Sequence, residues 1–130
     1  MATRTSLAAR NASLAAMVTR LASGIIRIYS GSQPATPETA ASGTLLGQLT
    51  LGSTAGTVTN GVMTANAITA DSVADATGTA GWFRVLRSDG TSVEFDGLCG
   101  TSAAECILDS VSIVAGGTVS ITALTYTLPQ

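Results

Sequence analysis

The apolar pattern of this chain changes its period at Gly24, and this change constrains the fold more than any other feature. Before Gly24 one stripe recurs at spacings of three and four residues, and it consists of Leu7, Asn11, Leu14, Val18 and Leu21. This spacing predicts one helix over residues 5–23, which Thr5 or Ser6 can cap and Gly24 can end. After Gly24 the pattern alternates with a period of two, which is typical of strands.

The strand pattern predicts the fold class. Residues 25–30 and 44–51 are apolar strand patterns, and Pro34 and Pro37 between them exclude a helix interior or a central strand. Residues 65–80 are polar and Ala-rich and predict no clear element. With about seven strands and no second helical pattern, we expect a mainly β fold. It is an antiparallel β-sandwich or a flattened barrel with an N-terminal α-helix.

Turn signals define the expected strand registers. Asn60 and Gly61 are typical of a two-residue type I′ turn that pairs Val58 with Met63. In residues 81–97 a three-residue loop, Ser88, Asp89 and Gly90, keeps apolar side chains on one face, whereas a two-residue loop would mix the faces. The pairs expected there are Val85 with Val93, Phe83 with Phe95 and Arg84 with Glu94. A last loop of Ala115, Gly116 and Gly117 is expected to pair Ile113 with Val119 and Val111 with Ile121.

Apolar residues that share a phase along these strands are expected to form the core. They are Ile26, Ile28, Leu45, Leu49, Phe83, Val85, Val93, Phe95, Val111, Ile113, Val119 and Ile121. The last strand slips in phase, because Leu124, Tyr126 and Leu128 alternate out of step with Ile121. Such a slip indicates a bulge, a strand that crosses between sheets, or an end that a partner buries.

Two surfaces are therefore candidates for contact with other subunits. We divide the chain into a helical arm, 1–24, and a β-sandwich domain, 25–130. The stripe of the arm could pack on its own domain, on a neighbouring subunit, or on copies of itself, where Asn11 would fix the register. The candidate interface residues are Leu7, Asn11, Leu14, Val18, Leu21, Leu124, Tyr126 and Leu128.

The chain contains neither histidine nor lysine, which argues against an enzyme. The usual general base, metal ligand and Schiff-base amine are missing, and we expect no catalytic residue, cofactor or metal. Most of the eight carboxylates fit turns, strand ends or a cross-strand arginine, so a glycosidase-like acid pair is not expected. The aromatic residues Tyr29, Trp82 and Tyr126 are more typical of packing than of a sugar-binding platform.

Charge and hydropathy exclude two further classes of partner. The six arginines are scattered and the net charge is −2, which argues against nucleic acid. No apolar run is long enough to span a membrane, and Arg10, Asn11 and Arg20 interrupt any signal peptide, so we expect synthesis in a cytoplasm. Charged residues are only 11% of the chain, which favours a surface that partners cover.

Cys99 and Cys106 enclose a short segment and leave two states open. They could close a small disulfide loop or remain free thiols. Folding in a cytoplasm argues against the disulfide, and later release into an oxidising medium argues for it.

Three segments, taken in order, resemble a group of small virion proteins of tailed bacteriophages. They are IRIYSGSQPATPETAASGTLLGQLTL (26–51), AGWFRVLRSDGT (80–91) and LDSVSIVAGGTVSITALTYT (108–127). The resemblance implies a virion structural protein, made in the host cytoplasm, that decorates or cements the capsid and binds the major capsid protein. By analogy with other decorating proteins we expect a homo-oligomer, with a trimer favoured over a dimer. The alternatives are a neck, head–tail or tail component and a carbohydrate- or receptor-binding module.

Overall fold

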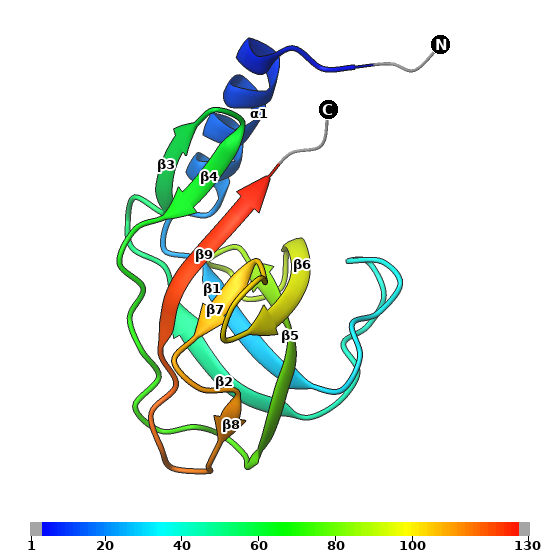
Figure 1. Cartoon of the computed structure of the whole chain (residues 1–130), viewed down its shortest axis with the longest axis vertical. Coiled ribbons are helices and arrows are strands. Elements are labelled where there is room, and N and C mark those ends of the chain that lie inside the picture. Colours follow the sequence, from blue (N-terminus) through cyan, green and yellow to red (C-terminus); the bar gives the residue numbers. More distant parts are fainter. Residues whose placement is uncertain (1–3, 128–130) are drawn as a thin grey trace.

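The computed structural model describes residues 4–127 and confirms the expected fold class, with one helix followed by a curled β-sheet (Figure 1). The helix α1 spans Leu7–Arg20. The strands are β1 (Ile25–Ser30), β2 (Leu45–Thr50), β3 (Gly56–Thr59), β4 (Val62–Ala65), β5 (Gly78–Leu86), β6 (Val93–Gly100), β7 (Cys106–Leu108), β8 (Ser112–Ile113) and β9 (Ile121–Thr127). The structure thus contains more strands than the sequence pattern predicted. The strands β7 and β8 have only three and two residues, which is too short for a recognisable alternating pattern.

The sheet curls into a half-barrel made of two half-sheets. Its strand order is β2-β1-β5-β6-β7-β9-β4-β3, and β8 pairs with β5 beside this path. We call β2-β1-β5-β6 the first half-sheet and β7-β9-β4-β3 the second half-sheet. Within each half-sheet the ladders are antiparallel, and the parallel pair β6–β7 joins the two.

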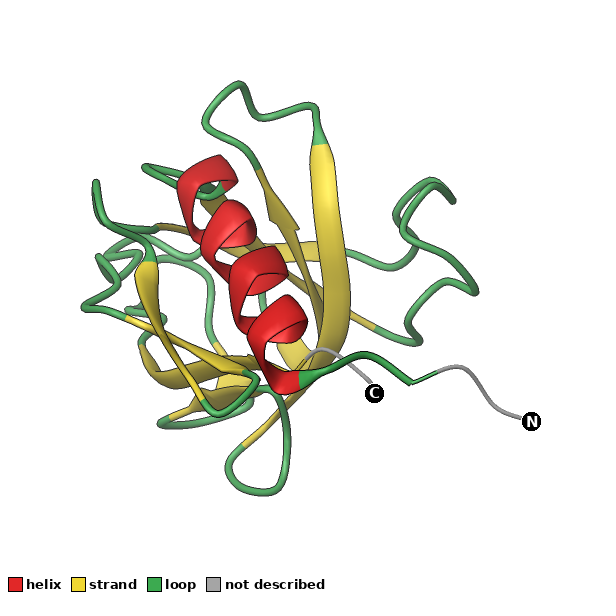
Figure 2. Ribbon diagram, turned by 90° about the horizontal axis from the view of Figure 1, so that it is seen from above, coloured by secondary structure: helices red, strands yellow, loops and turns green. Residues whose placement is uncertain are grey.

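The helix lies across one end of this half-barrel (Figure 2). The side chain of Ser6 caps it by accepting a hydrogen bond from the amide of Ala9, as expected for one of the two cap candidates. The helix packs mainly against the β3–β4 hairpin. After it, Ser23 adopts a left-handed φ of 55°, and its amide donates to the carbonyl of Gly52, which turns the chain into β1.

The β3–β4 hairpin confirms the register expected from its turn. Val58 pairs with Met63, and the two turn residues, Asn60 and Gly61, have φ of 52° and 74°. Positive φ at both central positions defines the type I′ turn, whose twist matches that of the strands. Asn60 and Gly61 are residue types that reach this conformation at low cost.

The β5–β6 hairpin differs from the expected register by two residues. Val85 pairs with Phe95, and Arg84 pairs with Asp96 rather than Glu94. The loop is longer than expected because the Asp89 carboxylate accepts hydrogen bonds from the amides of Thr91 and Ser92. A shift of two keeps Phe95 and Asp96 on their predicted faces. Gly90 still has a positive φ, 74°.

A bulge in β6 explains why Glu94 leaves the ladder. Leu86 pairs with Val93 while Val85 pairs with Phe95, so Glu94 is the extra residue. A bulge changes the direction of side chains, and Glu94 contacts Arg20 of the helix instead of the expected Arg84.

The expected hairpin at residues 111–121 is wrong. The turn at Gly116 and Gly117 forms, but Ile113 pairs with Gly78 in β5, and Val119 forms an isolated bridge with Asp71. Hydrogen bonds from the Gly116 amide to the Ala74 carbonyl, and from the Ala74 amide to the Gly117 carbonyl, tie the turn to the 65–80 segment instead. That segment has no recognisable pattern, so its competition for these strands was not predictable.

The phase slip in the last strand is a β-bulge. In the β7–β9 ladder Leu108 pairs with Ile121 and Ile107 pairs with Ala123, so Thr122 is the extra residue. Its hydroxyl donates to the carbonyl of Ile107 at 3.1 Å. Beyond the bulge the strand turns Leu124 into the core, which confirms one of the three explanations that the sequence allowed.

The core contains most of the expected residues. The expected residues that are buried are Ile26, Ile28, Leu49, Phe83, Val85, Phe95, Ile113 and Val119. Leu45, Val93, Val111 and Ile121 are only half-buried. At β2 the reason is a bulge, because the extra residue Leu46 takes the buried place expected for Leu45. The Cys106 and Leu108 side chains complete this core from β7.

Candidate interaction surfaces

The structure buries the middle and the end of the helical stripe within the chain itself. Leu14 and Leu21 are 1% and 0% exposed and belong to the same buried cluster as the strands. Val18 is half-buried against that cluster, and Leu7 is 43% exposed. Leu14 and Leu21 are therefore corrected from interface candidates to core residues, because the β3–β4 hairpin and the sheet already cover them.

Asn11 also has an intramolecular role. Its side-chain oxygen accepts a hydrogen bond from the amide of Gly61 at 2.9 Å. This contact joins the helix to the β3–β4 turn, so the polar position in the stripe fixes the helix on its own chain. Asn11 is therefore not needed to set a register between helices.

In β9 the apolar residues Leu124 and Tyr126 also contact their own chain. Leu124 is fully buried, and the half-buried Tyr126 ring lies 4.6 Å from the Phe95 ring. Leu124 is thus corrected to a core residue, and Tyr126 has an internal partner. Leu128 lies outside the described residues.

Tyr29 and Trp82 form a buried stack rather than an exposed platform. Their ring centroids are 4.6 Å apart, and the two residues are 8% and 0% exposed. The Arg84 guanidinium lies 5.2 Å from the Trp82 ring centroid, within the range of a cation–π contact. This packing removes the three-aromatic platform, as the preferred interpretation of the sequence expected.

Arg84 and Asp96 form a buried ion pair, a pairing that the sequence did not predict. The guanidinium donates from Nε to Oδ1 at 2.7 Å and from Nη2 to Oδ2 at 3.0 Å. Their side chains are 6% and 1% exposed, so Asp96 has a buried structural role. The hydrogen bonds to Asp96 raise the pKa of Arg84 above its ordinary value.

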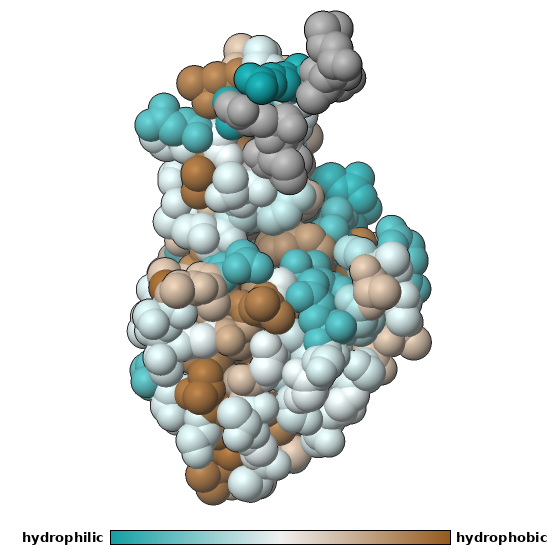
Figure 3. Space-filling view, turned by 45° about the vertical axis from the view of Figure 1, so that its right-hand side comes forward, coloured by the Kyte–Doolittle hydropathy of each residue, from teal (hydrophilic) through white to brown (hydrophobic). Residues whose placement is uncertain are grey.

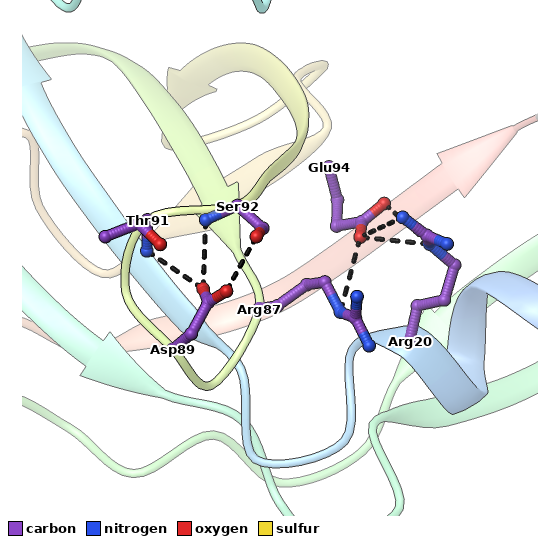
Figure 4. A network of polar contacts seen from close by, with 6 residues as sticks. All are labelled: Arg20, Arg87, Asp89, Thr91, Ser92 and Glu94. Carbon is purple, nitrogen blue, oxygen red and sulfur yellow. Dashed lines mark hydrogen bonds and ion pairs between the residues drawn. The ribbon is translucent and has the colours of Figure 1, made fainter.

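A second charged network lies between the helix and the β5–β6 loop (Figure 4). The single N–H at Nε of Arg20 donates to both carboxylate oxygens of Glu94, and Glu94 lies 3.8 Å from Nε of Arg87. The hydrogen bonds to Glu94 raise the pKa of Arg20. Within residues 4–127 no three His, Cys, Asp or Glu side chains lie close enough together to hold a metal ion.

Among residues 4–127 the two most exposed large apolar residues lie at the end of the half-barrel opposite the helix. Val73 and Val114 are 65% and 62% exposed. Their segments are joined by hydrogen bonds, because Ala74, next to Val73, is hydrogen-bonded to Gly116 and Gly117 of the turn that begins at Val114. We call these two residues and their turns the valine end. Figure 3 shows hydrophobic surface at this end of the molecule.

The valine end was not predicted from the sequence. Val73 lies in the segment without a pattern, and Val114 follows the inward-facing Ile113. Strict alternation would have placed Val114 on the surface, but nothing in the sequence indicated that the segments of the two valines are joined by hydrogen bonds. Leu98, at 50% exposed, is the comparable apolar residue on β6 and lies elsewhere on the surface.

A shallow pocket of about 400 Å³ opens beside β6 and β9. Its lining residues are Phe95, Asp96, Glu105, Thr125, Tyr126 and Thr127. Aromatic rings beside polar oxygens are typical of sites for small polar ligands. However, the Asp96 carboxylate is already engaged by Arg84.

Comparisons with protein-family models, with curated proteins and with solved structures found no match. In the described part of the chain, α1 is too short to cross a bilayer. The surfaces described above therefore have to be interpreted from their own geometry.

Proposed function

We propose that this chain is a non-enzymatic structural protein of a bacteriophage virion that decorates the capsid and binds the major capsid protein. The observation that carries the proposal is the valine end, where two exposed apolar side chains project from hydrogen-bonded turns. The order of the three sequence segments supports the same class of protein.

The turns of the valine end suit a contact surface because their backbone is already ordered. The Val73 amide donates to the Asp71 carboxylate, and the Gly117 amide donates to the Val114 carbonyl. A preordered surface loses little conformational entropy on binding, so more of the free energy of the apolar contact contributes to affinity. Two valines give a weak contact, and many copies on one shell would give strong attachment by avidity.

The contact can be tested with a double variant, Val73→Ser with Val114→Ser, and a matched control, Leu98→Ser. All three side chains are exposed, so the free energy of unfolding of each variant should lie within about 0.5 kcal/mol of the wild-type value. Particles assembled with the double variant should carry fewer copies than wild-type particles, as measured by quantitative mass spectrometry. The Leu98→Ser variant should retain wild-type occupancy.

Full occupancy of the double variant would refute the valine end as the capsid contact. Absence of the chain from purified particles would refute the virion assignment itself. A cryo-EM map of the particle distinguishes a decorating protein, bound to the head as a trimer or another oligomer about a local axis, from a neck or tail component.

A carbohydrate-binding module is the second candidate, and the pocket beside Phe95 and Tyr126 is the observation that favours it. Binding of the isolated protein to a glycan array, lost in Tyr126→Ala, would support this candidate. No binding on such an array would leave the virion structural role as the better explanation.

A further inference from the structure

The two half-sheets are joined by a very short ladder. The parallel β6–β7 pair contains two residue pairs, Cys99 with Cys106 and Gly100 with Ile107. Every other ladder along the strand order between β2 and β3 is antiparallel and has at least three pairs. We call this β6–β7 ladder the joint, because it connects the two half-sheets. The cysteine pair is therefore one of the two residue pairs of the joint.

The two thiols face each other at this joint. Residues that pair directly on neighbouring strands point to the same face of a sheet, and the strands lie about 4.8 Å apart. This spacing falls within the Cα separations of about 4.4–6.8 Å that a disulfide allows. A hydrogen bond with Cys99, together with burial, raises the pKa of the Cys106 thiol, in agreement with direct contact.

The connection between β6 and β7 is unusual and strained. Parallel strands normally need a crossover of about a dozen residues or more, whereas residues 101–105 make this connection alone. Ala103 adopts a left-handed φ of 52°, which is unfavourable for a residue with a Cβ. The connection is also fixed at one end, because the Glu105 carbonyl accepts a hydrogen bond from the Thr125 amide of β9.

We propose that Cys99 and Cys106 form a redox-sensitive disulfide that covalently joins the two half-sheets. Both residues are free thiols in the present structure. In a reducing cytoplasm they remain so, and in an oxidising medium they are converted to the disulfide. The disulfide does not depend on the proposed function, because it rests on the strand pairing alone.

The order of the reaction follows from exposure. Cys99 is half-buried and Cys106 is fully buried, so a small disulfide such as oxidised glutathione reaches Cys99 first. The Cys99 thiolate attacks one sulfur of oxidised glutathione and releases one reduced glutathione. The Cys106 sulfur then loses its proton as it attacks the Cys99 sulfur of the mixed disulfide, and the second glutathione is released. In the net reaction the two thiol protons end on the two released glutathiones, which are reduced by two electrons, and both protein sulfurs are oxidised.

The test compares reduced protein with protein incubated with oxidised glutathione. We expect the count of free thiols, measured under denaturing conditions, to fall from two per chain to zero. The intact mass should fall by two hydrogen atoms with no glutathione adduct, and the chain should remain a monomer on a non-reducing gel. A persistent adduct, a covalent dimer or two remaining thiols would overturn the proposal.

The effect on the joint is measured by thermal unfolding. Oxidation should raise the Tm of the wild type by roughly 5 °C or more. Cys99→Ser, which removes the more exposed thiol, should show no such rise under the same treatment. A disulfide that forms without a rise in Tm would overturn the conclusion that it strengthens the joint, and the wild-type comparison decides this even if a variant folds poorly.

Discussion

Arg20 and Glu94 connect the end of the helix to the bulge of β6, with Nε of Arg20 at 3.0 and 3.1 Å from the two carboxylate oxygens. The bulge places Glu94 outside the ladder, and the helix presents Arg20 in its last turn. Together with the contact between Asn11 and Gly61, this pair holds α1 at both ends. The helix is therefore part of the folded body rather than a separate arm.

The first prediction concerns the two leucines of the helix. Leu14→Ala should lower the free energy of unfolding by about 2–5 kcal/mol, because Leu14 is 1% exposed within the core. Leu7→Ala, on the same helix but 43% exposed, should cost far less. Urea unfolding of both variants checks the difference. Equal small losses would show that the helix is not part of the core, and a truncation of residues 2–22 would then leave a folded domain.

The second prediction concerns the Arg84–Asp96 pair. Asp96→Ala should destabilise the protein by about 3–5 kcal/mol, because it leaves the buried Arg84 guanidinium without its partner. The double variant Arg84→Met with Asp96→Leu should lose less free energy of unfolding than Asp96→Ala alone, because it contains neither buried charge. Urea unfolding measures both, and an Asp96→Ala variant as stable as the wild type would contradict the buried pair.

The third prediction concerns the pH dependence contributed by Asp89. Hydrogen bonds from the side chain and amide of Ser92 and from the amide of Thr91 hold the pKa of Asp89 well below its ordinary value. A lowered pKa in the folded state stabilises the fold above the unfolded-state pKa of about 3.9, and this contribution is lost as pH falls toward the folded-state pKa. Stability should therefore decline more steeply below about pH 4 in the wild type than in Asp89→Asn. Identical acid profiles in urea titrations would contradict this role.

The fourth prediction concerns the β5–β6 loop. Gly90 has a φ of 74°, and a Cβ added there would make only ordinary van der Waals contacts, with Ile25 and Arg27. Gly90→Val should therefore be destabilised by backbone strain, of about 1–3 kcal/mol, rather than by a clash. Gly90→Asn should lose much less stability than Gly90→Val, because asparagine tolerates the left-handed conformation. Thermal unfolding of both variants distinguishes strain from simple loss of glycine, and equal melting temperatures for the two would argue against a strained loop.

The sequence predicts elements best where the pattern is local. The capped helix, the Asn60–Gly61 hairpin and the buried face of Phe83 and Val85 follow from neighbouring residues, and the structure confirms them. The bulge at Thr122 is also one of the explanations that the phase slip allows.

The errors arise where a distant segment competes for the same strand. The partner of Ile113 is Gly78 rather than Val119, and Asp71 rather than Ile113 bridges Val119. The polar segment that decides both pairings carries no periodicity, so turn chemistry at Gly116 alone could not identify them. The buried stripe of the helix was ambiguous for the same reason, since a stripe does not specify what covers it.

The position of β4 in the sheet has a consequence for biosynthesis. β4 pairs with β3, which precedes it directly, and with β9, which the ribosome makes only after β5–β8. The helix and the β3–β4 hairpin can therefore form early, while the other edge of β4 stays unpaired until β9 has been made. Because an unpaired edge is a template for another chain, a nascent polypeptide arrested before β9 is the species that we expect to aggregate.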